Sequence, residues 1–249
     1  MDQITIIGID CSADPAKVGL SMAVEEGADR CVVRSAMACS SEREVVEKIV
    51  SWLAGTAKAL IAFDAPLGWP RPMGTALAAH RAGQLLAVAA NDLFRRATDR
   101  VVKEHLGKQS LDVGADRIAR TAHSALRLLA NLRRETALAI PLAWEPTYSD
   151  RVAAVEVYPA ATLITHGIPD TGYKKNEKIE ARKAIIGSLE RIIQLPADRG
   201  AMEQSSDPLD AVICVLAGHD FLRGKALHPK EPEEIELARH EGWIWVRAM

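Results

Sequence analysis

Acidic residues follow apolar segments at two places in this 249-residue chain. Asp10 follows the apolar run 3–9, and Asp64 follows the run 59–63. If both runs are neighbouring strands of one sheet, about 4.8 Å apart, the two carboxylates lie together at one edge. Like charges at that distance repel, so such a pair needs a shared cation or a proton. Carboxylate oxygens suit Mg²⁺ or Mn²⁺, and two such ions support phosphodiester hydrolysis.

Three further acids extend this pattern. Glu156 lies within the short apolar run 153–158, where the exposed face of an edge strand is an alternative explanation. Asp207 and Asp210 open a very apolar helix, and Asp207 also suits the N-cap position. Residues three apart share a helix face, so Asp210 can bind metal while Asp207 caps. The predicted catalytic residues are Asp10, Asp64, Glu156, Asp207 and Asp210, and the predicted metal ligands are Asp10, Asp64, Asp207 and Asp210.

Basic side chains that could hold phosphate occur in two segments. Arg95 and Arg96 precede Asp99, with which Arg96 has the (i, i+3) spacing of an ion pair. Lys174 and Arg182 belong to a basic stripe at the start of a predicted helix, about 176–195. Interleaved glutamates make a solvated helix face the alternative there. The predicted phosphate-binding residues are Arg95, Arg96, Lys174 and Arg182.

The order of apolar segments predicts the architecture that positions these residues. Three strands joined by short turns indicate an antiparallel meander, and later strands separated by helices indicate parallel crossovers. We therefore predict an α/β fold of the ribonuclease H-like type, with a mixed five-stranded sheet flanked by helices. Residues 1–249 form one predicted domain, with a helical insertion at about 71–150 after the fourth strand. The predicted strands are 3–9, 18–24, 30–36, 59–63 and 153–158, with an edge strand near 243–246.

The predicted helices carry recognisable start signals. Ser41 followed by Glu44 is a capping pattern that opens one helix. Asp207-Pro208 opens another, which runs to about Leu222. Residues 74–135 are expected to be mostly helical, with breaks near 97–99 and 107–114.

Composition restricts the class of protein. The chain is 48% hydrophobic and 26% charged with a net charge of −2, which excludes a disordered, collagen-like or coiled-coil protein. We predict a cytoplasmic protein, because no signal-peptide pattern or membrane-spanning run is visible. The cysteines lack CxxC spacing, so we expect reduced thiols and no zinc site. They are Cys11, Cys31, Cys39 and Cys214.

A set of short motifs, in this order along the chain, resembles the DUF429 family, described as predicted nucleases of the ribonuclease H fold. The motifs are Gly8-Ile9-Asp10-Cys11, Asp64-Ala65-Pro66-Leu67-Gly68-Trp69-Pro70, Arg96-Ala97-Thr98-Asp99, Glu156-Val157-Tyr158-Pro159-Ala160 and Asp207-Pro208-Leu209-Asp210-Ala211. The late Asp-x-x-Asp also resembles Holliday-junction resolvases of the same superfamily. The resemblance implies that Asp10, Asp64, Asp207 and Asp210 match the acidic residues that this superfamily brings together. Glu156 matches the family motif, but an acid on the fifth strand is not a general metal ligand across the superfamily. Its alternative role is to hold Arg96 or Lys174 in place.

The leading functional hypothesis is a nuclease or phosphodiesterase that uses Mg²⁺ or Mn²⁺ in a two-metal mechanism on DNA or RNA. No membrane partner is expected, and a homodimer is possible. Two alternatives stay open. One is a non-catalytic module that binds nucleic acid or protein on the same fold. The other is a phosphotransferase of the actin-like class, whose first strand begins similarly but whose glycine-rich phosphate loops are not visible after Asp64 or Glu156.

Overall fold

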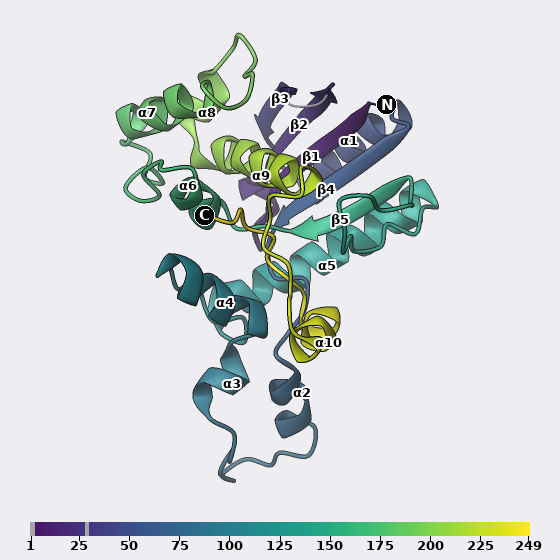
Figure 1. Ribbon diagram of the computed structural model, residues 1–249, viewed down its shortest axis with the longest axis vertical. Coiled ribbons are helices and arrows are strands. Elements are labelled where there is room, and N and C mark those ends of the chain that lie inside the picture. Colours follow the sequence, from purple (N-terminus) through teal and green to yellow (C-terminus); the bar gives the residue numbers. More distant parts are fainter. Residues whose placement is uncertain (1–2, 28–29) are drawn as a thin grey trace.

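A mixed five-stranded sheet lies in the upper part of the computed structural model as drawn in Figure 1, and the structure describes residues 3–27 and 30–249. Its strand order is β3-β2-β1-β4-β5. The first three strands are antiparallel neighbours, whereas β1 pairs with β4, and β4 with β5, in parallel. This arrangement confirms the predicted mixed five-stranded sheet, with an antiparallel meander followed by parallel strands. The strands are β1 (Ile4–Asp10), β2 (Gly19–Glu26), β3 (Arg30–Ala38), β4 (Lys58–Asp64) and β5 (Val152–Glu156).

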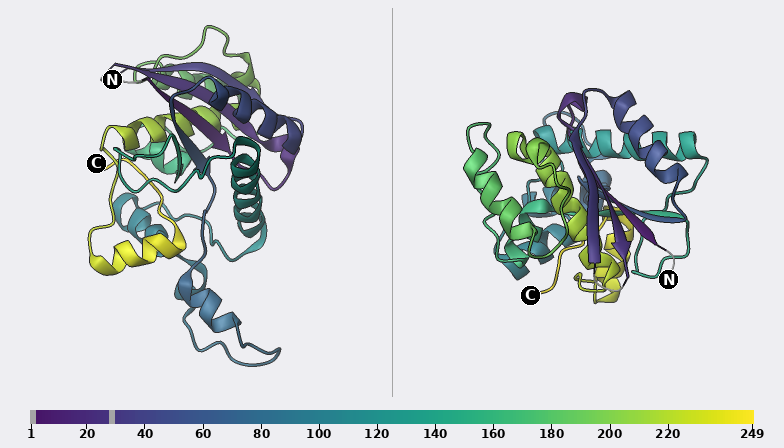
Figure 2. Two further views of the ribbon diagram at one scale, coloured as in Figure 1. Left: turned by 90° about the vertical axis from the view of Figure 1, so that its right-hand side faces the viewer. Right: turned by 90° about the horizontal axis from the view of Figure 1, so that it is seen from above.

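Helices cover both faces of the sheet, as the view from above shows (Figure 2). On one face, α9 (Ser206–Leu222) packs against β1, β2, β3 and β4. On the other, α1 (Glu42–Ala54) and α5 (Asp116–Thr136) pack against each other. Both faces are therefore buried, which explains why β1 and β4 are continuously apolar rather than alternating.

The remaining helices are short. The predicted N-cap of α1 is confirmed, because the Ser41 hydroxyl accepts a hydrogen bond from the Glu44 amide. The C-terminal segment adds an isolated parallel bridge from Ile244 to Glu156 in place of the predicted edge strand. The other elements are η1 (Pro15–Lys17), α2 (Arg71–Leu77), α3 (Ala90–Phe94), α4 (Ala97–Leu106), α6 (Pro159–Thr165), α7 (Ile179–Leu189), α8 (Gly200–Gln204) and α10 (Pro232–Glu241).

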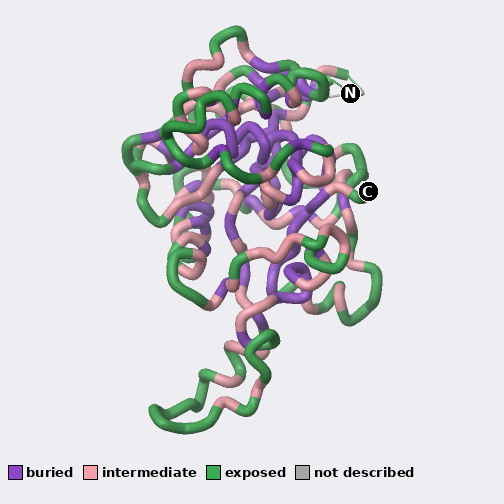
Figure 3. Tube along the Cα trace, turned by 90° about the vertical axis from the view of Figure 1, so that its left-hand side faces the viewer, coloured by how far each residue is buried: buried purple, intermediate pink, exposed green. Residues whose placement is uncertain are grey.

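The prediction of a mostly helical stretch over 74–135 is wrong between α2 and α3. Residues 78–89 form turns and extended chain at the end of an arm that projects away from the sheet, and most of them are exposed (Figure 3). A short helix without a packing partner is marginal in water, and this arm offers almost none. The predicted helix 176–195 is also shorter, because α7 covers only residues 179–189.

Two glycines let the start of α9 approach the sheet closely. A Cβ atom on Gly8 of β1 would lie 2.0 Å from the backbone oxygen of Ala211. A Cβ atom on Gly19 of β2 would lie 1.9 Å from the backbone oxygen of Asp207. The absence of side chains at these two positions brings the acidic first turns of α9 over the ends of β1 and β2.

We predict that Gly8→Ala destabilises the protein by several kcal/mol, because the added methyl group collides with backbone that cannot shift independently (~3 kcal/mol or more). Gly187→Ala in α7 is the matched control. Its Cβ would meet nothing within 4 Å, so it should be neutral or stabilise the helix by up to about 1 kcal/mol. Urea unfolding of both variants measures the difference, and equal stability would contradict the close-packing account.

Candidate active site

Asp10 and Asp64 lie side by side at the ends of two parallel strands. They are register partners in the β1–β4 ladder, as the sequence pattern predicts. Neither carboxylate receives a hydrogen bond or a close ion pair from any residue that the structure describes. The ladder therefore brings two acidic groups together, and the charge of Lys174 acts on both from a distance.

Asp210 of α9 completes this group of carboxylates, which we call the acidic cluster (Asp10, Asp64 and Asp210). Burial raises the pKa of Asp10 well above its usual value, and the charges of Asp210 and Asp64 raise it further. Burial also raises the pKa of Asp64 to about 7, against the lowering effect of Lys174. The pKa of Asp210 is raised by burial as well. Burial first, and repulsion between the acids second, thus disfavour the charged carboxylates, and a bound cation would stabilise them.

Asp210 is held by two neighbouring residues of one loop. The Tyr173 hydroxyl donates to Asp210 Oδ1 at 2.6 Å, and Lys174 Nζ lies 2.9 Å from Asp210 Oδ2. Burial alone would lower the pKa of Lys174, but the carboxylates of Asp210 and Asp64 raise it overall, so the ammonium stays charged. Lys174 is thus a built-in positive charge at the acidic cluster. Tyr173 has no sequence signal that marks it as a partner of Asp210.

Arg182 is not available to phosphate, which corrects the sequence-based prediction. The residue is completely buried. Its guanidinium donates to backbone carbonyl oxygens of Tyr173 and Lys175, and to that of Glu203 at the end of α8. Arg182 therefore fixes the loop that presents Tyr173 and Lys174 to Asp210, and acts as a positioning residue.

Asp207 lies at the margin of the acidic cluster, and its predicted capping role is wrong. Ser205 is the N-cap of α9, and its hydroxyl accepts a hydrogen bond from the Asp207 amide. The Asp207 carboxylate accepts from the Ser206 hydroxyl at 3.1 Å. Its charge contributes to the raised pKa values of Asp10 and Asp210, so it adds to the local negative field.

Arg96 is also not available to phosphate. It is 1% exposed and pairs with Asp99 and Glu156, the latter with an Nη2–Oε1 distance of 2.6 Å. Its Nη1 also donates to the backbone oxygen of Glu241. The guanidinium thus ties the start of α4 to the end of β5 and to the C-terminal segment, which is a structural task.

Glu156 belongs to this network. One of its carboxylate oxygens accepts from Arg96 and from the Leu67 amide, at 2.8 and 2.9 Å. Burial raises the pKa of Glu156, and the charge of Arg96 offsets only part of that increase. The predicted alternative, that Glu156 holds Arg96, agrees with these contacts. By binding the Leu67 amide, Glu156 also fixes the loop that follows Asp64.

Glu241 is a member of the network that the sequence reading missed. Its two carboxylate oxygens accept from the amides of Arg71 and Ala97, each at 2.8 Å. It joins the ends of α10, α2 and α4, and it lies 85 residues beyond Glu156. No local spacing marks such a contact.

Arg95 points to a different place. It pairs with Asp112 at 3.0 Å and does not line the cleft described next. The predicted phosphate-binding set therefore separates: Lys174 lies at the acidic cluster, whereas Arg95, Arg96 and Arg182 do not reach it in this structure.

A cleft of about 390 Å³ opens beside Asp64. Lys174 and Lys108 both line it, and Lys108 pairs with Asp170 at 2.6 Å across the two loops that border it. Tyr158 supplies an aromatic wall. A cavity of this volume is of the size that small ligands occupy. The further lining residues are Ala65, Pro66, Arg96, Asp99, Gln109, Ser110, Leu111, Ile118, Glu156, Val157, Ala160, Asp170 and Ile244.

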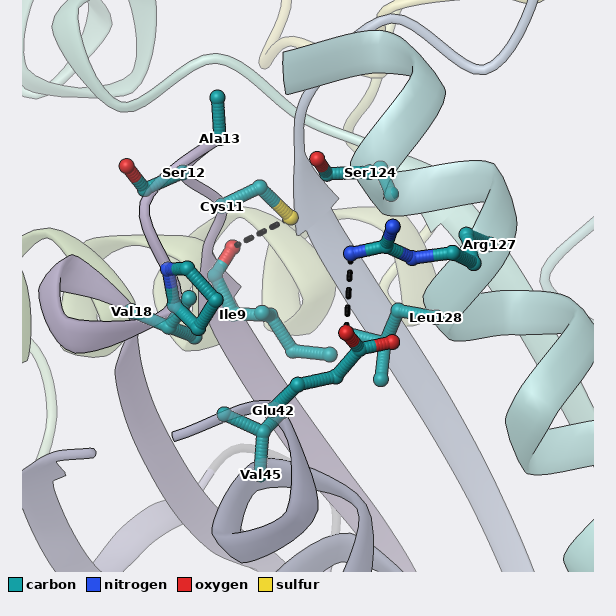
Figure 4. A pocket seen from close by; sticks show the side chains of 12 residues that line it. Ile9, Cys11, Ser12, Ala13, Val18, Glu42, Val45, Ser124, Arg127 and Leu128 are labelled. Atoms are coloured by element: carbon teal, nitrogen blue, oxygen red, sulfur yellow. Dashed lines mark hydrogen bonds and ion pairs between the residues drawn. The ribbon is translucent and has the colours of Figure 1, made fainter. Parts of the chain in front are cut away.

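A second cavity lies near the acidic cluster but on the face covered by α1 and α5. Cys11 and Leu128 are among the residues that line it, and Figure 4 shows the Cys11 sulfur directed toward the backbone oxygen of Ile9, with the Glu42–Arg127 ion pair across the pocket. Its volume of about 30 Å³ holds little more than a water molecule. It is a packing gap and is too small for a substrate.

The acidic cluster fits oxygen-preferring divalent cations. Its donors are carboxylates, which Mg²⁺ and Mn²⁺ prefer, and those of Asp10 and Asp64 accept no hydrogen bond from the described residues. Asp10, Asp64 and Asp210 are not gathered into a group whose ligand atoms all lie within 4.8 Å of one another. The cluster is therefore wider than the ligand shell of one ion, and it has Lys174 at its Asp210 side.

Comparison with known proteins places the chain in a family. Residues 8–234 match the family model described as protein of unknown function (DUF429), so the chain belongs to this family. No curated protein matches it. A Thermus thermophilus RuvC structure aligns with 9% sequence identity and a TM-score of 0.35, covering 88% of this chain and 96% of that chain. T. thermophilus RuvC in complex with Holliday junction substrate aligns with 10% identity and a TM-score of 0.35, covering 87% and 94%.

The described residues contain no helix that is long and apolar enough to cross a membrane.

We predict that Arg96→Met destabilises the protein by about 3–5 kcal/mol, because it leaves buried carboxylates without their counter-charge. Arg43→Met is the control, since Arg43 also pairs with a glutamate but on the exposed surface of α1. That variant should change the free energy of unfolding by less than about 0.5 kcal/mol. Chemical denaturation compares the two. A change below about 1 kcal/mol for Arg96→Met would contradict the proposed structural role.

The raised pKa of Asp64 predicts a pH-dependent stability of the metal-free protein. With a folded pKa of about 7 and an unfolded pKa of about 3.9, the folded state binds more protons than the unfolded state between these values. Stability therefore falls as pH rises through this window. Asp64→Asn removes that loss. The free energy of unfolding of this variant should therefore exceed that of the wild type by roughly 1–3 kcal/mol at pH 8, and by less at pH 5. Urea unfolding in the presence of a chelator measures both. A pH-independent difference would contradict the assignment.

Proposed function

We propose that this protein is a metal-dependent phosphodiesterase that cleaves nucleic acid, with Mg²⁺ or Mn²⁺ held by the acidic cluster. The observation that carries the proposal is the in-register pair of Asp10 and Asp64, with Asp210 brought beside it by α9. Three acids from distant parts of the chain meet where a cleft opens, and among the described residues a single cation, Lys174, offsets their charge.

The divalent ions would supply Lewis-acid stabilisation of the phosphate oxygens and a water of lowered pKa. Asp10 and Asp64 would hold them. Asp210 is oriented by Tyr173 and Lys174, and Asp207 adds negative charge at the margin. This division of roles leaves Glu156 outside the ligand set, because Arg96 and the Leu67 amide occupy its oxygens.

Lys174 has two tasks in this proposal. In the metal-free structure it provides the positive charge beside Asp210. Its side chain is also accessible and lines the cleft next to Asp64, so its ammonium can turn to a non-bridging phosphate oxygen once a metal ion balances the carboxylates. Lys108, at the other side of the cleft, offers a second cation to the nucleic-acid backbone.

The shape of the cleft favours a substrate strand that enters with one nucleotide beside the acidic cluster. Its volume of about 390 Å³ lies at the lower end of the range for small-ligand sites. Tyr158 offers a ring against which a base can stack. Cleavage of a single-stranded end or an unpaired nucleotide fits this geometry better than cleavage within an intact duplex.

The direct test is Mn²⁺- or Mg²⁺-dependent cleavage of labelled single-stranded DNA, single-stranded RNA, duplex DNA and a four-way junction. We expect Asp10→Asn and Asp64→Asn to abolish cleavage, because each removes a metal-binding charge, while both variants remain folded. Lys174→Met should lower kcat/KM by roughly 10²-fold, as expected for loss of one charged contact to the transition state.

The matched control for Lys174→Met changes a nearby cation that does not line the cleft. Lys178→Met alters an exposed cation beside the same loop and should leave cleavage unchanged. Full activity in both aspartate variants would refute the metal-site assignment. Substrate binding without turnover under all conditions would favour the alternative of a non-catalytic binding module, and a large thermal stabilisation by nucleoside triphosphate alone would favour a phosphotransferase.

A further inference from the structure

A second group of potential metal ligands lies far from the acidic cluster, at the other end of α9. It consists of Glu25 on β2, Cys31 on β3 and His219 on α9. One ligand atom from each residue lies within 4.8 Å of the other two, and all three residues are buried. Among the residues that the structure describes, no other three histidine, cysteine or acidic side chains meet this condition.

The fold brings these three residues together by a specific route. Glu25 and Cys31 are register partners across the β2–β3 hairpin, so their side chains lie on the same face of the sheet. α9 packs on that face, and His219 lies nine residues after Asp210 on it. That spacing is about 13 Å along the helix axis, so this group and the acidic cluster are separate sites.

Two members of the group are hydrogen-bonded to each other, whereas the third, Cys31, makes no such bond through its sulfur to any described residue. His219 Nδ1 and Glu25 Oε1 are 2.5 Å apart. The Cys31 sulfur, beside them, has no hydrogen-bond partner among the described residues. The nearby carboxylate of Asp220 is already engaged, with His166 Nε2 at 2.7 Å and with Arg247 at 2.8 Å.

We propose that Glu25, Cys31 and His219 form a binding site for a zinc-type transition-metal ion, which joins the β2–β3 hairpin to the C-terminal half of α9. One sulfur, one nitrogen and one oxygen donor form a set that Zn²⁺ accepts and that Mg²⁺ does not prefer. Ligand atoms of a tetrahedral zinc site lie about 3.3–3.8 Å apart, which small side-chain rotations reach from the present arrangement.

Binding requires simple proton changes. Burial raises the pKa of the Cys31 thiol, with further contributions from Glu25 and Asp220, so the thiol keeps its proton when no metal is bound. The metal ion takes the place of the thiol proton, which leaves to solvent. It also takes the place of the proton between His219 Nδ1 and Glu25 Oε1, which moves to His219 Nε2 as the imidazole changes tautomer. The side chains of Glu25 and His219 are each 8% exposed, which leaves access for a water as fourth ligand.

Cobalt(II) is the probe for the test, because thiolate-bound Co²⁺ gives a ligand-to-metal charge-transfer band in the near ultraviolet. The full chain is stripped with a chelator and titrated with Co²⁺ alone. We expect the band to saturate at one Co²⁺ per chain and to disappear when Zn²⁺ is added. Cys31→Ser should abolish the band. Cys39→Ser changes another buried thiol, directly after β3, and should retain the band.

A further control separates this site from the acidic cluster. Cys11 and Cys214 are two other thiols, and they lie close to Asp10 and Asp64: burial raises their pKa values first, and the charges of these acids raise them further. If Co²⁺ bound to these thiols at the acidic cluster, Asp64→Asn would alter the band, so the band must persist in that variant. That variant separates this site from the acidic cluster, and the result stands even if no nuclease activity is found.

If Cys31→Ser does not fold, His219→Gln keeps the thiol and should weaken Co²⁺ binding at least tenfold. Absence of the band in the wild-type protein, its persistence in Cys31→Ser, or unchanged affinity in His219→Gln would each overturn the proposal.

Discussion

The central constraint in this structure is electrostatic. The parallel pairing of β1 and β4 aligns Asp10 with Asp64 at the sheet edge, and α9 adds Asp210 from the side. Burial raises the pKa values of all three carboxyl groups, and repulsion from neighbouring acids raises them further. A fold that concentrates negative charge in this way is destabilised unless a cation is present, and Lys174 provides only one positive charge.

Much of the surrounding structure serves to hold that arrangement. Gly8 and Gly19 allow α9 to approach the strands. Arg182 fixes the loop that carries Tyr173 and Lys174. The Arg96 network fixes the loop after Asp64 through Glu156. Two arginines that a sequence reading assigns to phosphate are thus buried supports for the groups that line the cleft.

The sequence predicted the mixed sheet, with its antiparallel meander and parallel crossovers, and indicated Asp10 and Asp64 as a pair if their strands were neighbours, because apolar strands that end in an acid carry a local signal. The start of α1 at Ser41 and the extent of α9 were predicted for the same reason. Other features depend on contacts between distant segments. The spacing of Arg96 and Asp99 indicated their ion pair, and Glu156 was an alternative partner, but the burial of this network was not visible in the sequence. Arg182 has no such signal, and only its burial against backbone carbonyl oxygens of other segments shows its role. Glu241 and Tyr173 lack any spacing signal, and residues 78–89 have helical composition but no partner to pack on.

The most direct measurement is an anomalous-scattering difference map from crystals of the wild-type protein soaked in Mn²⁺. The account predicts at least one manganese peak in contact with the carboxylates of both Asp10 and Asp64, together with a displaced Lys174 ammonium if a second ion binds at Asp210. Manganese bound elsewhere in the crystal, with no peak between Asp10 and Asp64 and with Lys174 still on Asp210, would contradict it.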